Sequence, residues 1–114
     1  MTLPNDQIDE LKALFPGLAK YEEGPLVYFL IPNLQLPRGC EPSVVDALFC
    51  PMNRGDGYPS RLFFASRIKS PIERNWNGQD VRIIERNWYA ISWQIGNATL
   101  RLAQMISAHV RAFQ

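Results

Sequence analysis

Three side chains in this sequence belong to the types that most often carry nucleophilic or acid–base chemistry: Cys40, Cys50 and His109. Cys40 follows a glycine in a proline-rich stretch, where a loop would expose its thiol. Cys50 ends an apolar run before Pro51, which is more typical of a small buried side chain. His109, with an ordinary pKa of about 6.5, suits a general base, although its position on a helical apolar face also fits the edge of a core. Cys40 and His109 are therefore candidate catalytic residues.

The same residues do not form a pattern that holds a metal. The two cysteines are not at the spacing of zinc ligands, and one histidine is available to join them. Their spacing also allows a disulfide, but the reducing cytosol favours free thiols. We therefore expect no metal and no other cofactor.

Charge and hydropathy argue against nucleic acid and membranes as partners. The formal net charge is +1, and no long block of like charges could capture a polyanion. The longest strongly apolar run, Leu26 to Ile31, is far shorter than the ~20 residues that span a bilayer. Asp6, Asp9 and Glu10 stand where a leader would be basic and apolar. We expect a cytoplasmic protein that binds neither nucleic acid nor membrane.

Four segments have the composition of β-strands. The predicted strands are 26–31, 43–50, 61–65 and 81–84. Asn77-Gly78 is the strongest hairpin signal in the chain, and it predicts a turn that leads into the fourth strand. Residues 21–24 are predicted to be a polar turn, and the proline-rich residues 33–42 a loop or a broken continuation of a strand at a sheet edge.

Helices are predicted near both ends of the sequence. Apolar residues at helical spacing predict a short helix over 6–15 with Asn5 or Asp6 as its N-cap. The same spacing predicts a final helix that begins near Asn97 or Thr99. The length of 114 residues allows one core and one domain. The order of elements predicts an α+β fold with an N-terminal helix, a four-stranded antiparallel β-meander and a C-terminal helix.

Aromatic residues are concentrated in the last third of the sequence. Trp76, Trp88, Tyr89 and Trp93 lie within eighteen positions, more aromatic surface than four short strands usually need. One interpretation is a packed second half of the core. The other is a patch that binds a partner, because tryptophan and tyrosine often anchor interfaces. We expect at least one of these side chains to be exposed.

Several short motifs follow one another through the chain. They are Leu36-Pro37-Arg38-Gly39, the run from Val45 to Pro51, Gly57-Tyr58-Pro59, and the run from Trp88 to Trp93. In this order they resemble the prokaryotic E2 (ubiquitin-conjugating-like) family E, over residues 25–113. That family has a Leu-Pro-x-Gly turn, an Asp-containing strand that ends in proline, a Tyr-Pro pair, and a segment with tryptophan and serine before the last helix. The histidine that often follows that serine is absent here. The resemblance implies an E2/UBC-like fold.

The resemblance also implies a function in bacterial ubiquitin-like conjugation. A ThiF-like (E1-like) activating enzyme would adenylate the C-terminus of a ubiquitin-like protein and pass it to this chain, which would transfer it to an amine of a protein substrate. An ordinary E2 enzyme has its catalytic cysteine at a position near residues 80–86, where this chain has none. Ser92, in the segment that matches the family's serine motif, is then the first candidate nucleophile, although a hydroxyl needs an activating base. The alternative is a serine that caps a turn or the last helix.

The remaining candidates have weaker signals. Asn77 matches the asparagine that donates to the oxyanion in E2 enzymes, although Asn-Gly is also a common plain turn. The residues assigned to partner binding are Tyr58, Trp76, Trp88 and Trp93. Two other functions are compatible with the same sequence. One is a non-catalytic module that binds a ubiquitin-like protein or an E1-like enzyme, and the other is an unrelated α+β interaction domain.

Overall fold

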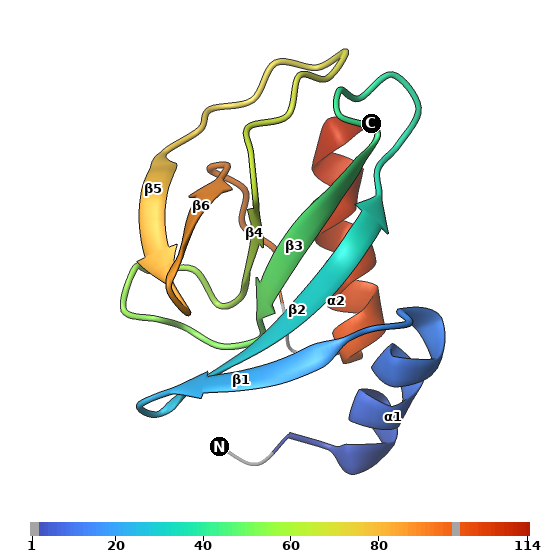
Figure 1. The fold of residues 1–114 in the computed structure, drawn as a ribbon, viewed down its shortest axis with the longest axis vertical. Helices are drawn as coiled ribbons and strands as arrows, with labels where there is room; N and C mark the ends of the chain where they lie inside the picture. Colours follow the sequence, from blue (N-terminus) through green and yellow to red (C-terminus); the bar gives the residue numbers. More distant parts are fainter. Residues whose placement is uncertain (1–2, 97–98) are drawn as a thin grey trace.

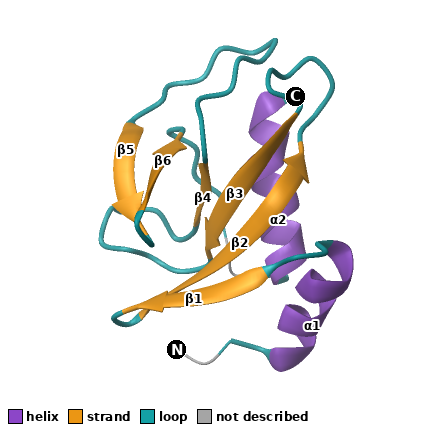
Figure 2. Cartoon of the chain, in the orientation of Figure 1, coloured by secondary structure: helices purple, strands orange, loops and turns teal. Residues whose placement is uncertain are grey.

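The chain folds into one curled antiparallel sheet with helices packed on one face, in a computed structural model that describes residues 3–96 and 99–114 (Figure 1). The elements are α1 (Asn5–Leu14), β1 (Ala19–Glu23), β2 (Leu26–Gln35), β3 (Val44–Cys50), β4 (Arg61–Phe64), β5 (Gly78–Ile83), β6 (Arg86–Ala90), α2 (Leu102–Val110) and a final 3₁₀ turn (Arg111–Phe113). The strand order across the sheet is β1-β2-β3-β4-β6-β5. Figure 2 shows the two helices beside the sheet and the long loops at one end of it.

The central strands are apolar on both faces because both faces are covered. Side chains alternate between the two faces of a strand, so neighbouring residues enter different clusters. The helix-side cluster includes Leu11, Phe29, Phe49, Phe64 and Ile106. The opposite cluster includes Tyr28, Leu48, Phe63, Ile83 and Trp88. The curl of the sheet folds β5 and β6 over this second cluster, and it brings two hairpin tips together, where the backbone N–H of Ile84 donates to the Glu23 carboxylate.

The predicted α+β class is confirmed, but the four-stranded meander of the E2/UBC-like prediction is wrong because the sheet has six strands. The two additional strands are β1 and β6. β1 is polar because it lies at the sheet edge, where backbone pairing with β2 requires no buried side chains. β6 pairs with β4 through Phe64 and Tyr89, and therefore separates β4 from β5. The predicted strand 81–84 consequently pairs with β6 rather than with β4.

β2 continues beyond its predicted end at residue 31. Its register with β3 shifts between Ile31 and Leu34, and Asn33 has a φ of 54°. This irregularity is a bulge, which allows the strand to pass Pro32 before pairing resumes. The prediction that the strand continues, with a break, into residues 33–42 is therefore correct as far as Gln35, where β2 ends.

Asn77-Gly78 does not form the predicted hairpin turn. Gly78 begins β5 and pairs with Ala90, and a Cβ at position 78 would lie 3.3 Å from the Ala90 Cβ. The glycine therefore allows two strands to approach closely. The turn between β5 and β6 instead places Ile84 and Glu85 at φ values of 47° and 63°. Neither residue type favours this left-handed region, so the sequence contains no signal for the turn.

Replacing Glu85 with glycine is expected to stabilise the protein by about 1 kcal/mol, because glycine removes the cost of the left-handed conformation. The measurement is the midpoint of urea unfolding at constant m-value. Glu85→Ala is the matched control, since it removes the same exposed side chain and keeps the backbone cost. Equal midpoints for the glycine and alanine variants would contradict the prediction.

α1 agrees with the predicted helix over 6–15 to within one residue. Its N-cap is Pro4, which makes no side-chain hydrogen bond, rather than Asn5 or Asp6. The backbone carbonyl of Pro4 accepts the N–H groups of Gln7 and Ile8, so the first turn is closed by backbone bonds. The predicted side-chain cap is therefore wrong.

α2 begins later than predicted. Its N-cap is Arg101, whose backbone N–H donates to Gln104 Oε1 at 2.8 Å. Thr99 precedes this cap, and Asn97 lies outside the described residues. In residues 3–96 and 99–114, neither α1 nor α2 has the length and apolar character that crossing a membrane requires.

Candidate functional site

Ser92 lies at the surface, two residues beyond the end of β6. Its backbone N–H donates to the Asn75 carbonyl oxygen at 2.7 Å, which fixes the chain at this point. The preceding residue, Ile91, is buried, so Ser92 marks the boundary between core and solvent. The serine side chain is therefore both accessible and attached to a fixed backbone.

Tyr58 and Asn77 form a hydrogen-bonded chain with Ser92. The Tyr58 hydroxyl donates to Ser92 Oγ at 3.3 Å, and it accepts a hydrogen bond from Asn77 Nδ2 at 2.8 Å. Tyr58 lies in the loop between β3 and β4, Asn77 directly precedes β5, and Ser92 follows β6. Because β6 lies between β4 and β5, residues that are 19 and 34 positions apart meet here.

The guanidinium of Arg61, the first residue of β4, lies against this chain. Its Cζ atom is 4.2 Å from the centre of the Tyr58 ring, and its Nη2 atom donates to Asn77 Oδ1 and to the Ile91 carbonyl oxygen. Because Arg61 can only donate, Asn77 must present its oxygen to Arg61 and its nitrogen to Tyr58. Tyr58, Arg61, Asn77 and Ser92 are named the Tyr58 cluster below.

The loop that carries Tyr58 is held by its own polar groups. Asp56 Oδ2 accepts from Arg61 Nη1 at 3.2 Å, and Asp56 Oδ1 accepts the Tyr58 backbone N–H at 3.2 Å. Gln94, two residues beyond Ser92, donates to the Gly57 carbonyl oxygen at 3.4 Å. The loop is therefore tied to β4 and to the segment that follows β6.

These contacts lower the pKa of Tyr58. The hydrogen bond with Ser92 contributes most to the lowering, and the Asn77 amide and the Arg61 charge act in the same direction. Partial burial of the ring and the nearby Asp56 carboxylate oppose this effect. The physical reason is that hydrogen-bond donors and a cation stabilise the phenolate more than the neutral phenol.

Both cysteines are free thiols in the core, with Cys40 5% exposed and Cys50 fully buried. The prediction that Cys40 is exposed in a loop is wrong, because its side chain belongs to the helix-side cluster together with Leu36 and Ile68. Cys50 is a small buried side chain, as predicted. Burial raises the pKa of both thiols, which disfavours the reactive thiolate.

His109 lies within the core rather than at its edge. Its side chain is 4% exposed, with Nε2 2.9 Å from Ser60 Oγ and its ring edge-on to Phe49. Burial lowers the pKa of His109 to about 4, and the Arg61 charge adds to this effect. The ring is therefore neutral at pH 7, and its contacts direct it to Ser60 and Phe49 rather than to Ser92.

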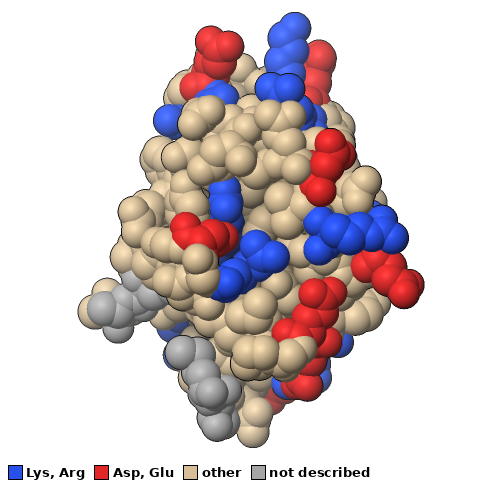
Figure 3. Space-filling view, turned by 90° about the vertical axis from the view of Figure 1, so that its left-hand side faces the viewer, with Lys and Arg blue, Asp and Glu red and all other residues tan. Residues whose placement is uncertain are grey.

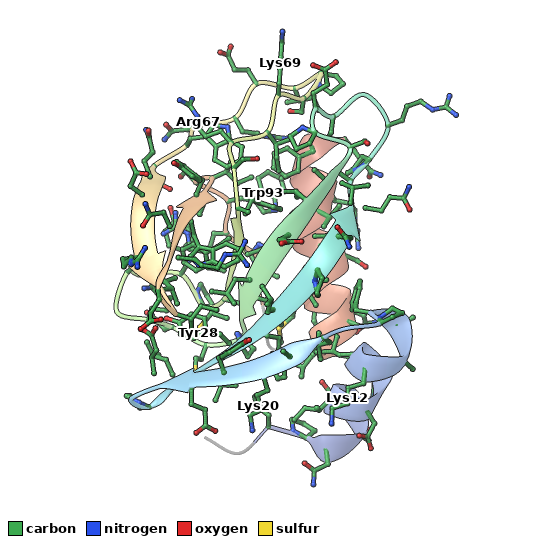
Figure 4. The ribbon with its side chains drawn as sticks, in the orientation of Figure 1. Lys12, Lys20, Tyr28, Arg67, Lys69 and Trp93 are labelled. Atoms are coloured by element: carbon green, nitrogen blue, oxygen red, sulfur yellow. The ribbon has the colours of Figure 1, made fainter. Side chains whose placement is uncertain are left out.

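The tryptophan side chains face inward. Trp76 and Trp88 are buried, and Trp88 Nε1 donates to the Ile83 carbonyl oxygen at 3.0 Å. Trp93 is half-buried beside α2, where its Nε1 donates to the Ala108 carbonyl oxygen at 3.2 Å (Figure 4). Trp76 and Trp88 therefore belong to the core, whereas Tyr89 is partly exposed and its hydroxyl donates to Asp80 Oδ1 at the surface. Of the residues assigned to partner binding, Tyr58 keeps its hydroxyl at the surface.

Charged side chains on the face that carries β5 and β6 do not gather into a patch of one sign. Basic and acidic side chains are intermixed there (Figure 3). Arg67 and Lys69 lie on the long loop between β4 and β5 and point away from the sheet. Over residues 3–96 and 99–114, histidine, cysteine and acidic side chains form no group of three that could hold a metal ion.

The Tyr58 cluster combines a hydroxyl and a phenol that could carry out acyl transfer. An exposed hydroxyl in contact with a phenol of lowered pKa can act as a nucleophile toward an activated acyl group. Arg61 is the member that sequence reasoning missed, and the available signal was a cation at the start of an otherwise apolar strand. Comparison of the chain with protein-family models, curated proteins and solved structures gives no match.

Proposed function

We propose that this chain carries a ubiquitin-like protein as an ester on Ser92. In this reaction a ThiF-like (E1-like) enzyme activates the C-terminal carboxyl group of the ubiquitin-like protein, Ser92 accepts the acyl group, and an amine of a protein substrate takes it. One observation carries the proposal: the exposed Ser92 hydroxyl contacts the Tyr58 phenol, which the Asn77 amide holds in place. The reaction requires no cofactor in this chain, and we place it in the cytoplasm.

The chemistry consists of two acyl transfers. In the first, Ser92 Oγ attacks the carbonyl carbon of an acyl adenylate, a C–O bond forms, AMP leaves with the electron pair of the broken bond, and the serine proton passes to a base. In the second, the substrate amine attacks the ester carbonyl, a C–N bond forms, the C–Oγ bond breaks, the amine nitrogen loses a proton, and the serine oxygen regains one. Ester formation at a hydroxyl requires that base, because an unactivated serine is a weak nucleophile.

Ser92→Ala is expected to abolish the covalent adduct. The adduct is sought after incubation with the ubiquitin-like protein and the ThiF-like enzyme encoded by neighbouring genes, with ATP, and it is read by denaturing gel and mass spectrometry. An ester at Ser92 is cleaved by hydroxylamine or mild base, whereas an amide resists both. Cleavage therefore identifies the bond as well as the residue.

Ser107→Ala is the matched control, since Ser107 is an exposed serine on α2 outside the Tyr58 cluster. It should form as much adduct as the unmodified protein. Adduct formation that persists in Ser92→Ala, or no adduct with the unmodified protein under any of these conditions, would contradict the proposal.

A non-catalytic binding module is the second candidate function. Two observations favour it. Both cysteines are buried, and the His109 ring is directed to Ser60, so it is not placed to act as a base for Ser92. A titration with the ubiquitin-like protein or the E1-like enzyme separates the two candidates. Unchanged affinity and unchanged cellular function in Ser92→Ala would select the binding module.

A further inference from the structure

We infer that Tyr58 is the general base that takes the proton from Ser92, and that Arg61 and Asn77 are the positioning residues that hold it. This inference rests on the proposed function, in which Ser92 is the nucleophile. The predicted base, His109, is directed to Ser60, so the Ser92 hydroxyl needs another acceptor within hydrogen-bond reach. The Tyr58 oxygen, whose hydroxyl donates to Ser92 Oγ at 3.3 Å, becomes such an acceptor when the phenol ionises.

The hydrogen bonds around Tyr58 suit both of its protonation states. As a phenol, Tyr58 donates to Ser92 Oγ and accepts from Asn77 Nδ2. As a phenolate, it can accept from both groups, because the serine hydroxyl rotates to donate. The proton can therefore move from Ser92 to Tyr58 without rearrangement of heavy atoms.

The charges that face Tyr58 favour its ionisation. The Arg61 guanidinium lies 4.2 Å from the ring centre and is 7% exposed, so solvent screens it weakly. Asp56 is the opposing charge, and it is paired with Arg61 at 3.2 Å and with Arg54 at 3.7 Å. His109, whose pKa burial and the Arg61 charge both lower, is neutral above about pH 4. Arg61 and Asp56 are therefore the charged groups that act on Tyr58, and the effect of Arg61, which contacts the ring directly, is the larger of the two.

Two other tyrosines show the opposite behaviour. Burial raises the pKa of Tyr28, and a hydrogen bond to the Asp80 carboxylate raises the pKa of Tyr89. Tyr58, whose pKa is lowered, is therefore the one of these three that ionises first as pH rises. This difference separates the titration of Tyr58 from those of Tyr28 and Tyr89.

Arg61 connects the members of the Tyr58 cluster. One guanidinium stacks on Tyr58, donates to Asn77 Oδ1, and donates to the Ile91 carbonyl oxygen next to Ser92. Its Nε atom is buried and has no hydrogen-bond partner among the described residues. A buried donor without a partner is costly. The presence of a buried arginine at position 61 is thus better explained by its contacts with Tyr58 and Asn77 than by a contribution to the stability of the fold.

The Ser92 proton has a defined destination in both acyl transfers. Ser92 Oγ attacks the acyl carbon while its proton passes to the Tyr58 phenolate oxygen, a new C–O bond forms, and the leaving group departs with its electron pair. When an amine later attacks the ester, a C–N bond forms, the C–Oγ bond breaks, the Tyr58 phenol returns this proton to the departing Ser92 oxygen, and the amine nitrogen releases its extra proton to solvent. Tyr58 is therefore a base in the first transfer and an acid in the second.

The test uses p-nitrophenyl acetate, a small activated ester that needs neither protein partner. Acetylation of Ser92 is followed by p-nitrophenolate release and located by mass spectrometry. Tyr58→Phe keeps the ring over Arg61 and removes the acceptor oxygen, and we expect the rate to fall by about 10²- to 10⁴-fold. Tyr89→Phe is the matched control, because it removes an exposed tyrosine hydroxyl outside the cluster, and it should leave the rate unchanged.

The pH dependence separates a base from a structural role. In the unmodified protein, the acetylation rate should rise with the same midpoint as the phenolate absorbance that Tyr58→Phe removes. Asn77→Ala deletes one donor to the phenolate, so both midpoints should move together to higher pH. A residue that only supports the fold would not move the two midpoints in parallel. Circular dichroism checks that each variant remains folded.

Each outcome decides the inference. A Tyr58→Phe rate within about twofold of the unmodified rate would overturn it, against the 10²-fold or larger loss that a general base predicts. Acetylation on Tyr58 itself, or a folded protein in which Ser92 is not acetylated, would also overturn it. Acetylation of Ser92 that depends on Tyr58, without an adduct of the ubiquitin-like protein, would support Tyr58 as the base and reject the proposed function.

Discussion

Truncating Trp88 to alanine is expected to lower the free energy of unfolding by about 3–5 kcal/mol, the range for removing a large aromatic side chain from a core. Trp88, on β6, is fully buried in the cluster on the face of the sheet opposite the helices. Its loss would leave a cavity among Tyr28, Phe63 and Ile83, and it would leave the Ile83 carbonyl oxygen without its indole partner. Both effects destabilise the folded state.

The measurement is equilibrium urea unfolding of the variant and the unmodified protein. Asn87→Ala is the matched control, because Asn87 is exposed on the same strand and its substitution should change the stability by no more than about 0.5 kcal/mol. A Trp88→Ala variant that unfolds like the control while losing affinity for a protein partner would contradict the assignment of Trp88 to the core.

A fold alone does not determine the chemistry of this chain. The six-stranded order replaces the simple meander, yet it is this order that makes the site. β6 lies between β4 and β5, so the segment after β6 reaches the loop that precedes β4. Ser92 and Tyr58 meet for that reason. The contact between Ser92 and Tyr58 supports the proposed acyl transfer, which therefore does not depend on the fold class.

The predictable parts of the fold were those with buried apolar patterns. Residues 47–50 of β3 and 62–64 of β4 are apolar runs because both of their faces are covered, and these runs were visible in the sequence. β1 was not predictable from side-chain pattern, because an edge strand pairs through its backbone. The turn at Ile84 and Glu85 gave no signal, since both residues adopt a conformation that their side chains disfavour. Gly78 gave a misleading signal for a turn, because glycine is favoured both in turns and where two strands approach closely.

Members of the candidate site were predictable one by one but not as a set. Ser92, Asn77 and Tyr58 were each singled out by resemblance to a family, with Tyr58 expected to bind a partner. Their contacts depend on which strands pair, and strand order is a long-range property that local pattern does not specify. Arg61 was missed as a site residue because an arginine at a strand end is usually solvated, whereas here it is 7% exposed.

Acidification below about pH 6.5 is expected to destabilise the protein through His109. Its pKa in the folded protein is about 4 because the ring is buried beside Ser60 and near Arg61. In the unfolded chain the ordinary pKa is about 6.5, so the unfolded state binds the proton first as pH falls. The stabilising contribution is complete above about pH 6.5 and is lost progressively down to about pH 4. Each pH unit in this window costs about 1.4 kcal/mol per proton, which gives a total of roughly 3 kcal/mol.

His109→Gln isolates this contribution, because glutamine retains a polar side chain toward Ser60 and does not titrate. Carboxylates that are protonated in acid affect both proteins, so they cancel in the difference between the two stability curves. That difference, measured by urea unfolding at several pH values, should fall steeply between about pH 6.5 and pH 4 and be flat above this window. A flat difference throughout would mean that His109 titrates with an ordinary pKa. The guanidinium of Arg61 makes that outcome unfavourable, because a charged imidazole beside Ser60 would face a second buried cation.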